Sequence, residues 1–308
     1  MTVLTPQELL QQLKQGSQFK EAELSHIDLQ GENLDRANFE QAYLRGANFT
    51  QASCQQTDFT KAVLIFANLS EANFTKANLE NANLTSANLT GANFRETQAH
   101  KVKLHGAKLD RLDAVNAHFL EADLETAQGT AANFSNANLS KAKLTSIQLL
   151  QTNLSNAYLR EVNLVDANFK EIAGRQINLE KAILTHSSWS NSDLTNADLM
   201  AAKGKSCQWS DLILRDADLY SITLTNSQLT RVDLSNVSLL SANLEGSRLT
   251  EVNLTDANLQ DANLENTIWQ NVDFSSCIVT GAVFTDAQGL TDEQKEWLQR
   301  NGALNIPD

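Results

Sequence analysis

The stretch ANLSEANFTKANLENANLTSANLTGANF, from Ala67 to Phe94, repeats a five-residue pattern without a gap. Counting in fives from Phe19 to Gly289 gives 55 positions, and 44 of them hold Leu or Phe. Two residues before these lie 54 further positions, of which 30 hold Ala. Eleven of the twelve Phe residues follow this register, and Phe66 is the exception. The register does not slip anywhere, so no loop is inserted into the repeat.

A period of five fits neither an α-helix, with 3.6 residues per turn, nor a strand, with two. It places one large and one small residue of every five inside and three outside. A chain satisfies that pattern by winding continuously and stacking each turn on the one before, so that stability is a sum over neighbouring layers. Asn and Asp are abundant just before the large residue, and their side chains bond to nearby backbone groups in turns. The pattern therefore predicts a solenoid with a narrow core.

The quoted stretch resembles the pentapeptide-repeat family, whose pattern is commonly written A(D/N)LXX, and the resemblance covers about 90% of the chain. It implies an all-β solenoid, a right-handed quadrilateral β-helix of about 13 coils with four pentapeptides per coil. The expected domains are an N-terminal capping helix over residues 1–17, the β-helix over residues 18–289 and a C-terminal capping helix over residues 290–308.

Both capping helices have start signals in the sequence. Thr5 and Thr291 are good N-caps, and Glu8 and Gln294 follow them at the spacing of a capping box. Such helices would shield the open edges of the first and last coil from pairing with another chain. The residues expected to contact those coils are Leu9, Leu10 and Leu13 at the N-terminal end and Trp297, Leu298 and Leu304 at the C-terminal end.

Composition and charge exclude several classes of protein. The chain has 308 residues and a net charge of −13, which argues against direct nucleic-acid binding because such sites need a basic surface. Three dispersed cysteines, Cys54, Cys207 and Cys277, rule out a disulfide scaffold and fall at inward positions. No apolar run approaches the ~18–20 residues that span a bilayer, and the N-terminus lacks the features of a signal peptide. We therefore expect a soluble, cytoplasmic protein with no membrane contact.

No motif for catalysis, a cofactor or a metal is present. The sequence has no GxSxG, no glycine-rich phosphate loop and no dinucleotide fingerprint. A solenoid without inserted loops also has no obvious concave pocket. We expect no enzyme activity, no cofactor and no metal. The five histidines, none of which has HExxH spacing, are His26, His100, His105, His118 and His186.

One outward column stands apart on the predicted surface. Met200, Tyr220 and Leu240 lie 20 residues apart, in three successive coils. A contiguous apolar stripe indicates a contact surface, whereas single exposed apolar residues are normal. Arg215 is the only base in the region of this column on its own side and the preceding one. The candidate partner-binding residues are Met200, Tyr220, Leu240, Asp198, Asp216, Asp218 and Asp261.

The charge is unevenly distributed along the chain. Residues 191–308 hold 17 acids and 7 bases, or −10, whereas residues 1–190 hold 20 acids and 17 bases, or −3. Such asymmetry can mark an interaction surface. The alternative is a solvated acidic surface with a few stray apolar residues.

Three functions fit these observations. The first is a non-catalytic scaffold or regulator that binds an unidentified partner protein. Many members of the family come from cyanobacteria, so the resemblance suggests a role in cyanobacterial cell regulation. The second is an acidic DNA mimic that binds a type II topoisomerase, DNA gyrase, as some family members do, because a basic DNA-binding site attracts an anionic rod. The third is a structural rod without a specific partner.

Overall fold

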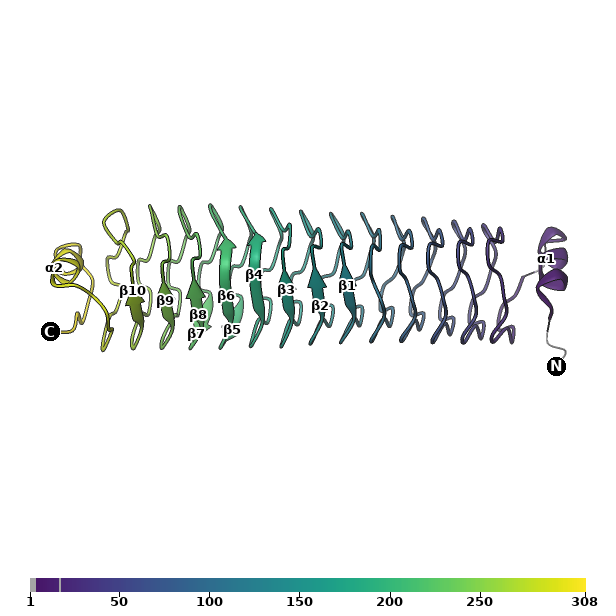
Figure 1. The fold of residues 1–308 in the computed structure, drawn as a ribbon, viewed down its shortest axis with the longest axis horizontal. Helices are drawn as coiled ribbons and strands as arrows, with labels where there is room; N and C mark the ends of the chain where they lie inside the picture. The colour runs from purple at the N-terminus through teal and green to yellow at the C-terminus, as the bar shows by residue number, and fades with distance from the viewer. Residues whose placement is uncertain (1–3, 17) are drawn as a thin grey trace. The chain divides into compact units, whose positions relative to one another are not determined.

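The computed structural model describes residues 4–16 and 18–308 and divides into two compact units, Met1–Ala157 and Tyr158–Asp308. Each unit is a β-helix in which short parallel bridges join residues 20 positions apart (Figure 1). Asn48 pairs with Asn68 in this way in the first unit, and Asp198 pairs with Asp218 in the second. The solenoid predicted from the repeat and the all-β fold implied by the family resemblance are both confirmed.

The expected count of about 13 coils in one continuous β-helix is not supported. Each unit, considered separately, forms a β-helix of about seven turns. The repeat register counts pentapeptides along the chain, but it cannot show that all of them stack as one body. The right-handed, four-sided form that the resemblance implies stays a prediction.

Most pairing is through single bridges, and longer strands form mainly on one side of each unit. In the first unit, β1 (Gln128–Thr130) pairs with β2 (Gln148–Leu150). In the second, the strands of one sheet follow in the order β3, β4, β6, β8, β9 and β10, and β5 pairs with β7. Their bounds are β3 (Asn168–Lys170), β4 (Ser188–Asp193), β5 (Lys203–Lys205), β6 (Gln208–Ile213), β7 (Thr223–Thr225), β8 (Gln228–Thr230), β9 (Arg248–Thr250) and β10 (Ile268–Gln270).

The core follows the five-residue register. All 44 Leu and Phe residues of the register are buried, whereas Phe66, the one Phe outside it, is 57% exposed. Phenylalanines 20 residues apart stack on one another, as Phe39 does on Phe59 with ring centres 5.3 Å apart. Cys54, Cys207 and Cys277 are buried as predicted. Each unit therefore buries a continuous stack of large side chains and fills the remaining space with small ones.

The turns between pentapeptides are of one main type. After Phe39, the N–H of Ala42 donates back to the Phe39 carbonyl at 3.0 Å, and Gln41 between them has a φ of +56°. A positive φ at the third residue identifies a type II turn. Asn48 shows the expected role of the preceding Asn, because its Oδ1 accepts from the N–H of Thr50 at 3.1 Å.

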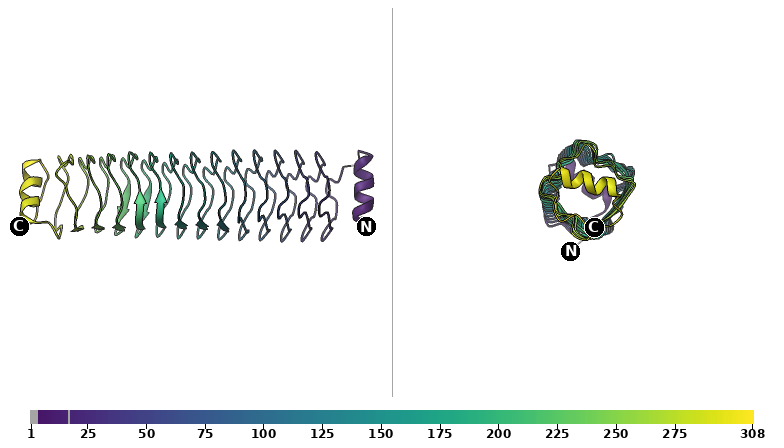
Figure 2. Two further views of the ribbon diagram at one scale, coloured as in Figure 1. Left: turned by 45° about the horizontal axis from the view of Figure 1, so that its top comes forward. Right: turned by 90° about the vertical axis from the view of Figure 1, so that its left-hand side faces the viewer.

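Both helices begin as predicted. In α1 (Pro6–Lys14) and α2 (Asp292–Arg300), the N-cap threonine and the residue three positions later form complete capping boxes. Figure 1 shows α1 beside the first coils of its unit, and Figure 2 shows α2 across the last coils of its own. Leu9 and Leu298 are buried, whereas Leu10, Leu13 and Trp297 are half-buried. Of the expected segment 1–17, residues 1–3 and 17 lie outside the described residues.

Leu304 contacts the last coil as expected, but through its backbone. Its side chain is 49% exposed. Its N–H donates to the Ala282 carbonyl at 2.7 Å, and its own carbonyl accepts from the N–H of Phe284 at 2.9 Å. The residues after α2 therefore extend the β-helix by one short bridge, to Val283.

Candidate functional site

The backbone of the second unit brings the predicted apolar residues into one column. The N–H of Ala201 donates to the Tyr220 carbonyl, and that of Ser221 donates to the Leu240 carbonyl, both at 2.9 Å. Met200, Tyr220 and Leu240 therefore occupy equivalent turn positions on successive coils. Met200 is 36% exposed and Tyr220 is 41% exposed, whereas Leu240 is half-buried. The exposed part of the column is thus a Met–Tyr pair with Leu240 at its edge.

Two of the predicted aspartates adjoin this column. Asp198 Oδ1 accepts from the N–H of Met200 at 3.0 Å, and Asp218 Oδ1 accepts from the N–H of Tyr220 at 2.9 Å. A second oxygen of Asp198 accepts from the side-chain amide of Asn178 at 3.0 Å. These carboxylates are held by turn hydrogen bonds, and each places a negative charge two residues before an exposed apolar side chain.

The other two predicted aspartates lie further from the Met–Tyr pair. Asp216 and Asp261 are exposed corner residues with φ of +58° and +55°. Asp216 and Tyr220 lie at opposite ends of the same five-residue side of one coil, with Asp218 between them. Asp261 lies one coil beyond Leu240. We call Met200, Tyr220, Leu240, Asp198, Asp216, Asp218 and Asp261 together the acidic–apolar surface.

The bases near this surface are already paired with other acids. Arg215 contacts Asp233 at 2.9 Å, and Arg175 contacts Asp193 at 2.9 Å. Burial opposes ionisation of Asp193 and Asp233, but hydrogen bonds from neighbouring hydroxyl, backbone and guanidinium groups outweigh it and lower the pKa of both carboxyls. Within residues 4–16 and 18–308, no Lys or Arg forms an ion pair with the four aspartates of the acidic–apolar surface. Their negative charge is therefore uncompensated.

The sequence reasoning did not identify a second exposed apolar group, which lies in the first unit. Tyr43 is 51% exposed, Phe66 is 57% exposed, and the guanidinium of Arg45 lies 5.4 Å from the centre of the Phe66 ring. The signal was available, because Phe66 breaks the register and Tyr43 stands where most repeats have Asn or Asp.

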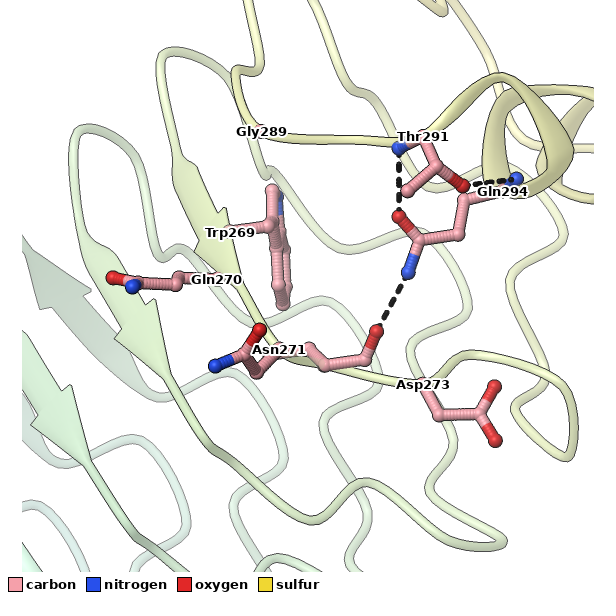
Figure 3. Close-up of a pocket in the computed structure, with 8 residues that line it drawn as sticks. Trp269, Gln270, Asn271, Asp273, Gly289, Thr291 and Gln294 are labelled. Atoms are coloured by element: carbon pink, nitrogen blue, oxygen red, sulfur yellow. Dashed lines mark hydrogen bonds between the residues drawn. The ribbon is translucent and has the colours of Figure 1, made fainter.

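A hollow of about 410 Å³ lies between the last coil and α2. Trp269, Gly289 and Gln294 line it, and Figure 3 shows the Gln294 side chain reaching across it. Both ends of that amide are already bonded, since Oε1 accepts from the Thr291 N–H at 2.9 Å and Nε2 donates to the Val272 carbonyl at 2.6 Å. The Gln294 amide therefore links the last coil to the start of α2 across this hollow.

Metal-ligating side chains converge at one place among the described residues. His105, Asp123 and Glu125, in the first unit, each offer one ligand atom, and these atoms lie within 4.8 Å of one another. Across the part of the chain that the structure describes, neither helix is long and apolar enough to cross a membrane.

Three solved structures are similar to parts of this chain at low sequence identity. HetL, a pentapeptide repeat protein involved in heterocyst differentiation regulation in the cyanobacterium Nostoc sp. strain PCC 7120, is 22% identical over 89% of this chain and 97% of its own, with a TM-score of 0.34. QnrB1, a plasmid-mediated fluoroquinolone resistance protein, is 17% identical over 64% and 95%, with a TM-score of 0.40. A pentapeptide repeat protein of the Arabidopsis thaliana thylakoid lumen is 20% identical over 43% and 72%, with a TM-score of 0.25. No curated protein sequence matches this chain.

A family model supports the resemblance directly. The model described as pentapeptide repeats matches eight times, at residues 17–53, 37–75, 77–113, 107–145, 139–172, 175–202, 213–250 and 257–288. These matches cover well over half of the sequence and follow the register that builds the core. This chain therefore belongs to the pentapeptide-repeat family.

Proposed function

We propose that this chain is a non-catalytic scaffold or regulator that binds a partner protein through the acidic–apolar surface of its second unit. The observation that carries the proposal is the pairing of exposed apolar groups with uncompensated charge. Met200 and Tyr220 project from adjacent coils, and Asp198 and Asp218 lie beside them without a basic partner. A partner that fits would present an apolar group flanked by Lys or Arg.

The energetics favour such a contact. Burying apolar surface is worth about 25 cal/mol per Å², and complementary charges raise the association rate and select the partner. The turns under Met200 and Tyr220 are already fixed by hydrogen bonds to Asp198 and Asp218. Little backbone ordering is therefore required on binding, and that lowers its cost. A role in cyanobacterial cell regulation and a cytoplasmic location belong to the proposal by analogy with the family alone.

The test compares capture of proteins from the source organism's lysate by wild type and by the triple variant Met200→Ser, Tyr220→Ser and Leu240→Ser. Serine occupies the equivalent turn position at Ser140, so the fold tolerates it. The proposal expects a stoichiometric partner that wild type retains and the folded triple variant loses. A partner bound equally by both proteins would refute the site.

A matched control removes apolar groups elsewhere. Tyr43→Ser with Phe66→Ser strips the exposed pair of the first unit and leaves the acidic–apolar surface intact. This control is expected to retain the partner. Loss of the partner in the control and not in the triple variant would move the site to the first unit.

The charges are tested separately by Asp198→Asn with Asp218→Asn. Asparagine stands at the same position in Asn178 and Asn258 and makes the same turn hydrogen bond, so this variant removes charge without removing the turn. We expect weaker capture, with a larger deficit at low salt than at high salt. An unchanged salt dependence would show that the aspartates do not face the partner.

DNA mimicry remains the alternative, and the acid excess of residues 191–308 is the observation that favours it. It predicts inhibition of gyrase supercoiling by the purified chain, whereas the scaffold proposal predicts none. The third alternative, a structural rod, predicts no specific partner in any of these experiments.

A further inference from the structure

We propose that His105, Asp123 and Glu125 form a binding site for a divalent transition-metal ion such as Zn²⁺, independent of the partner surface. One ligand atom from each residue lies within 4.8 Å of the other two. An imidazole nitrogen with two carboxylate oxygens is a donor set that Zn²⁺ accepts, with water in a fourth position. The three side chains come from two neighbouring coils of the first unit.

Backbone hydrogen bonds position the three residues that would bind the ion. The N–H of Gly106 donates to the Glu125 carbonyl at 2.9 Å, so His105 and Glu125 occupy equivalent turn positions 20 residues apart. Asp123 Oδ1 accepts from the N–H of Glu125 at 3.1 Å. That bond orients the Asp123 carboxylate and leaves its second oxygen available to bind a metal ion. Asp123 and Glu125 therefore lie on a rigid turn of one coil, and His105 lies opposite Glu125 on the preceding coil.

The spacing suits a shared ion better than a direct hydrogen bond. His105 Nδ1 and Glu125 Oε2 lie 4.0 Å apart, which is too long for a hydrogen bond. A zinc ion with bonds of about 2.1 Å holds two tetrahedral ligands roughly 3.4 Å apart. Closing that difference needs only a small rotation of two side chains that are 49% and 36% exposed.

Two features oppose the site and define the competing explanation. Lys103 and Lys143 flank Asp123 in the same column of bridges, and their charges weaken cation binding. Lys101 and Glu121 form a cross-coil ion pair at 3.4 Å, four residues earlier on the same two coils. The competing explanation is that His105 and Glu125 form one more such pair. The two explanations require different protonation states of the His105 imidazole. A metal requires the neutral imidazole, whereas an ion pair requires the imidazolium.

Calorimetric titration of the full-length, tag-free protein with Zn²⁺ alone separates them. We expect one site per chain at pH 7.5, weakened about tenfold or more at pH 5.5 because protons compete for the imidazole. His105→Ala is expected to abolish the site. Asp123→Asn is expected to weaken it about tenfold or more, and it keeps the fold because Asn83 and Asn163 occupy the same column with the same turn bond. His118→Ala, which removes an exposed histidine elsewhere in the unit, is expected to change nothing.

Three outcomes would overturn the proposal. They are an absence of Zn²⁺ binding by the wild type, equal binding by wild type and His105→Ala, and unchanged binding by Asp123→Asn. The second and third outcomes are read only from variants that far-ultraviolet circular dichroism shows to be folded. The partner-capture experiments use different residues, so either proposal can fail alone.

Discussion

The side-chain amide of Gln294 donates to the backbone carbonyl of Val272 at 2.6 Å, where a further coil would supply a backbone N–H. At the preceding pentapeptides the equivalent carbonyl is satisfied by the next coil, as that of Ala262 is by the N–H of Val283 at 2.9 Å. The same side chain accepts from the Thr291 N–H and so completes the capping box of α2. One residue therefore starts the helix and closes part of the open edge, which protects that edge from pairing with another chain.

Gln294→Glu should separate the two roles. Glutamate keeps the capping box, as Glu8 does in α1, but it cannot donate to the Val272 carbonyl. We expect a loss of about 1–3 kcal/mol in the stability of the α2 end, the cost of leaving a buried acceptor unpaired. Faster amide hydrogen exchange in α2 would report it. Gln294→Ala should lose more because the box is lost too, and a glutamate variant that exchanges like wild type would contradict the edge-closing role.

Gly289 should tolerate no side chain. It lies 20 residues after Trp269 with a φ of +83°, and a Cβ there would collide with the Trp269 carbonyl oxygen. Gly289→Ala should destabilise the second unit by about 2 kcal/mol or more, from backbone strain plus the clash. Gly31→Ala is the matched control, since its φ is +70° and the space around its Cβ is empty. Equal falls in melting temperature for the two variants would exclude the clash as the cause.

The core and the surface columns could be predicted because one strict rule governs both. The register of five, combined with the four pentapeptides per coil that the family resemblance implies, placed Met200 beside Tyr220, and no insertion disturbed that spacing. The five-residue register likewise separated buried phenylalanines from Phe66. Patterns that depend only on spacing are therefore readable directly from this sequence.

Features that depend on rotamers and on the backbone could not be predicted. The corner after nearly every large residue has a positive φ, and residues as different as Lys141, Glu121 and Phe66 adopt it. Composition therefore gives no sign of the turn type. The pairing of Arg215 with Asp233 rather than with the acidic–apolar surface is likewise a matter of side-chain reach. The convergence of His105 with Asp123 and Glu125 has the same origin, because these residues share no sequence motif.

The three cysteines should be unreactive in the folded protein. Burial raises the pKa of Cys54 and Cys207, and burial together with Asp273 and Asp256 raises that of Cys277 to about 12. At pH 8 a thiol of that pKa is only roughly one part in 10⁴ thiolate, the reactive form. Iodoacetamide followed by mass spectrometry should therefore label all three cysteines in guanidinium chloride and almost none without it. Stoichiometric labelling of the native protein would show that the coils open.

The stabilising effect of Asp233 should disappear in acid. Burial alone would raise the pKa of this carboxyl, but hydrogen bonds from Ser235 and from Arg215 lower it below its ordinary value of about 3.9. A lowered pKa in the folded state means that the carboxylate stabilises the fold above about pH 4, and that this contribution is lost as the pH falls through the folded pKa. Asp233→Asn keeps an acceptor for the Ser235 N–H and loses the ion pair with Arg215.

We therefore expect Asp233→Asn to be less stable than wild type at pH 7 by about 1 kcal/mol or less, because the Arg215 side chain is 55% exposed. Near pH 2.5 the two proteins should melt together. Asp216→Asn, which removes an exposed carboxylate without an ion pair among the described residues, is the matched control and should not lower stability at either pH. A deficit in Asp233→Asn that persisted in acid would mean that its carboxylate stabilises the coil by packing and hydrogen bonding, and that its charge contributes nothing measurable.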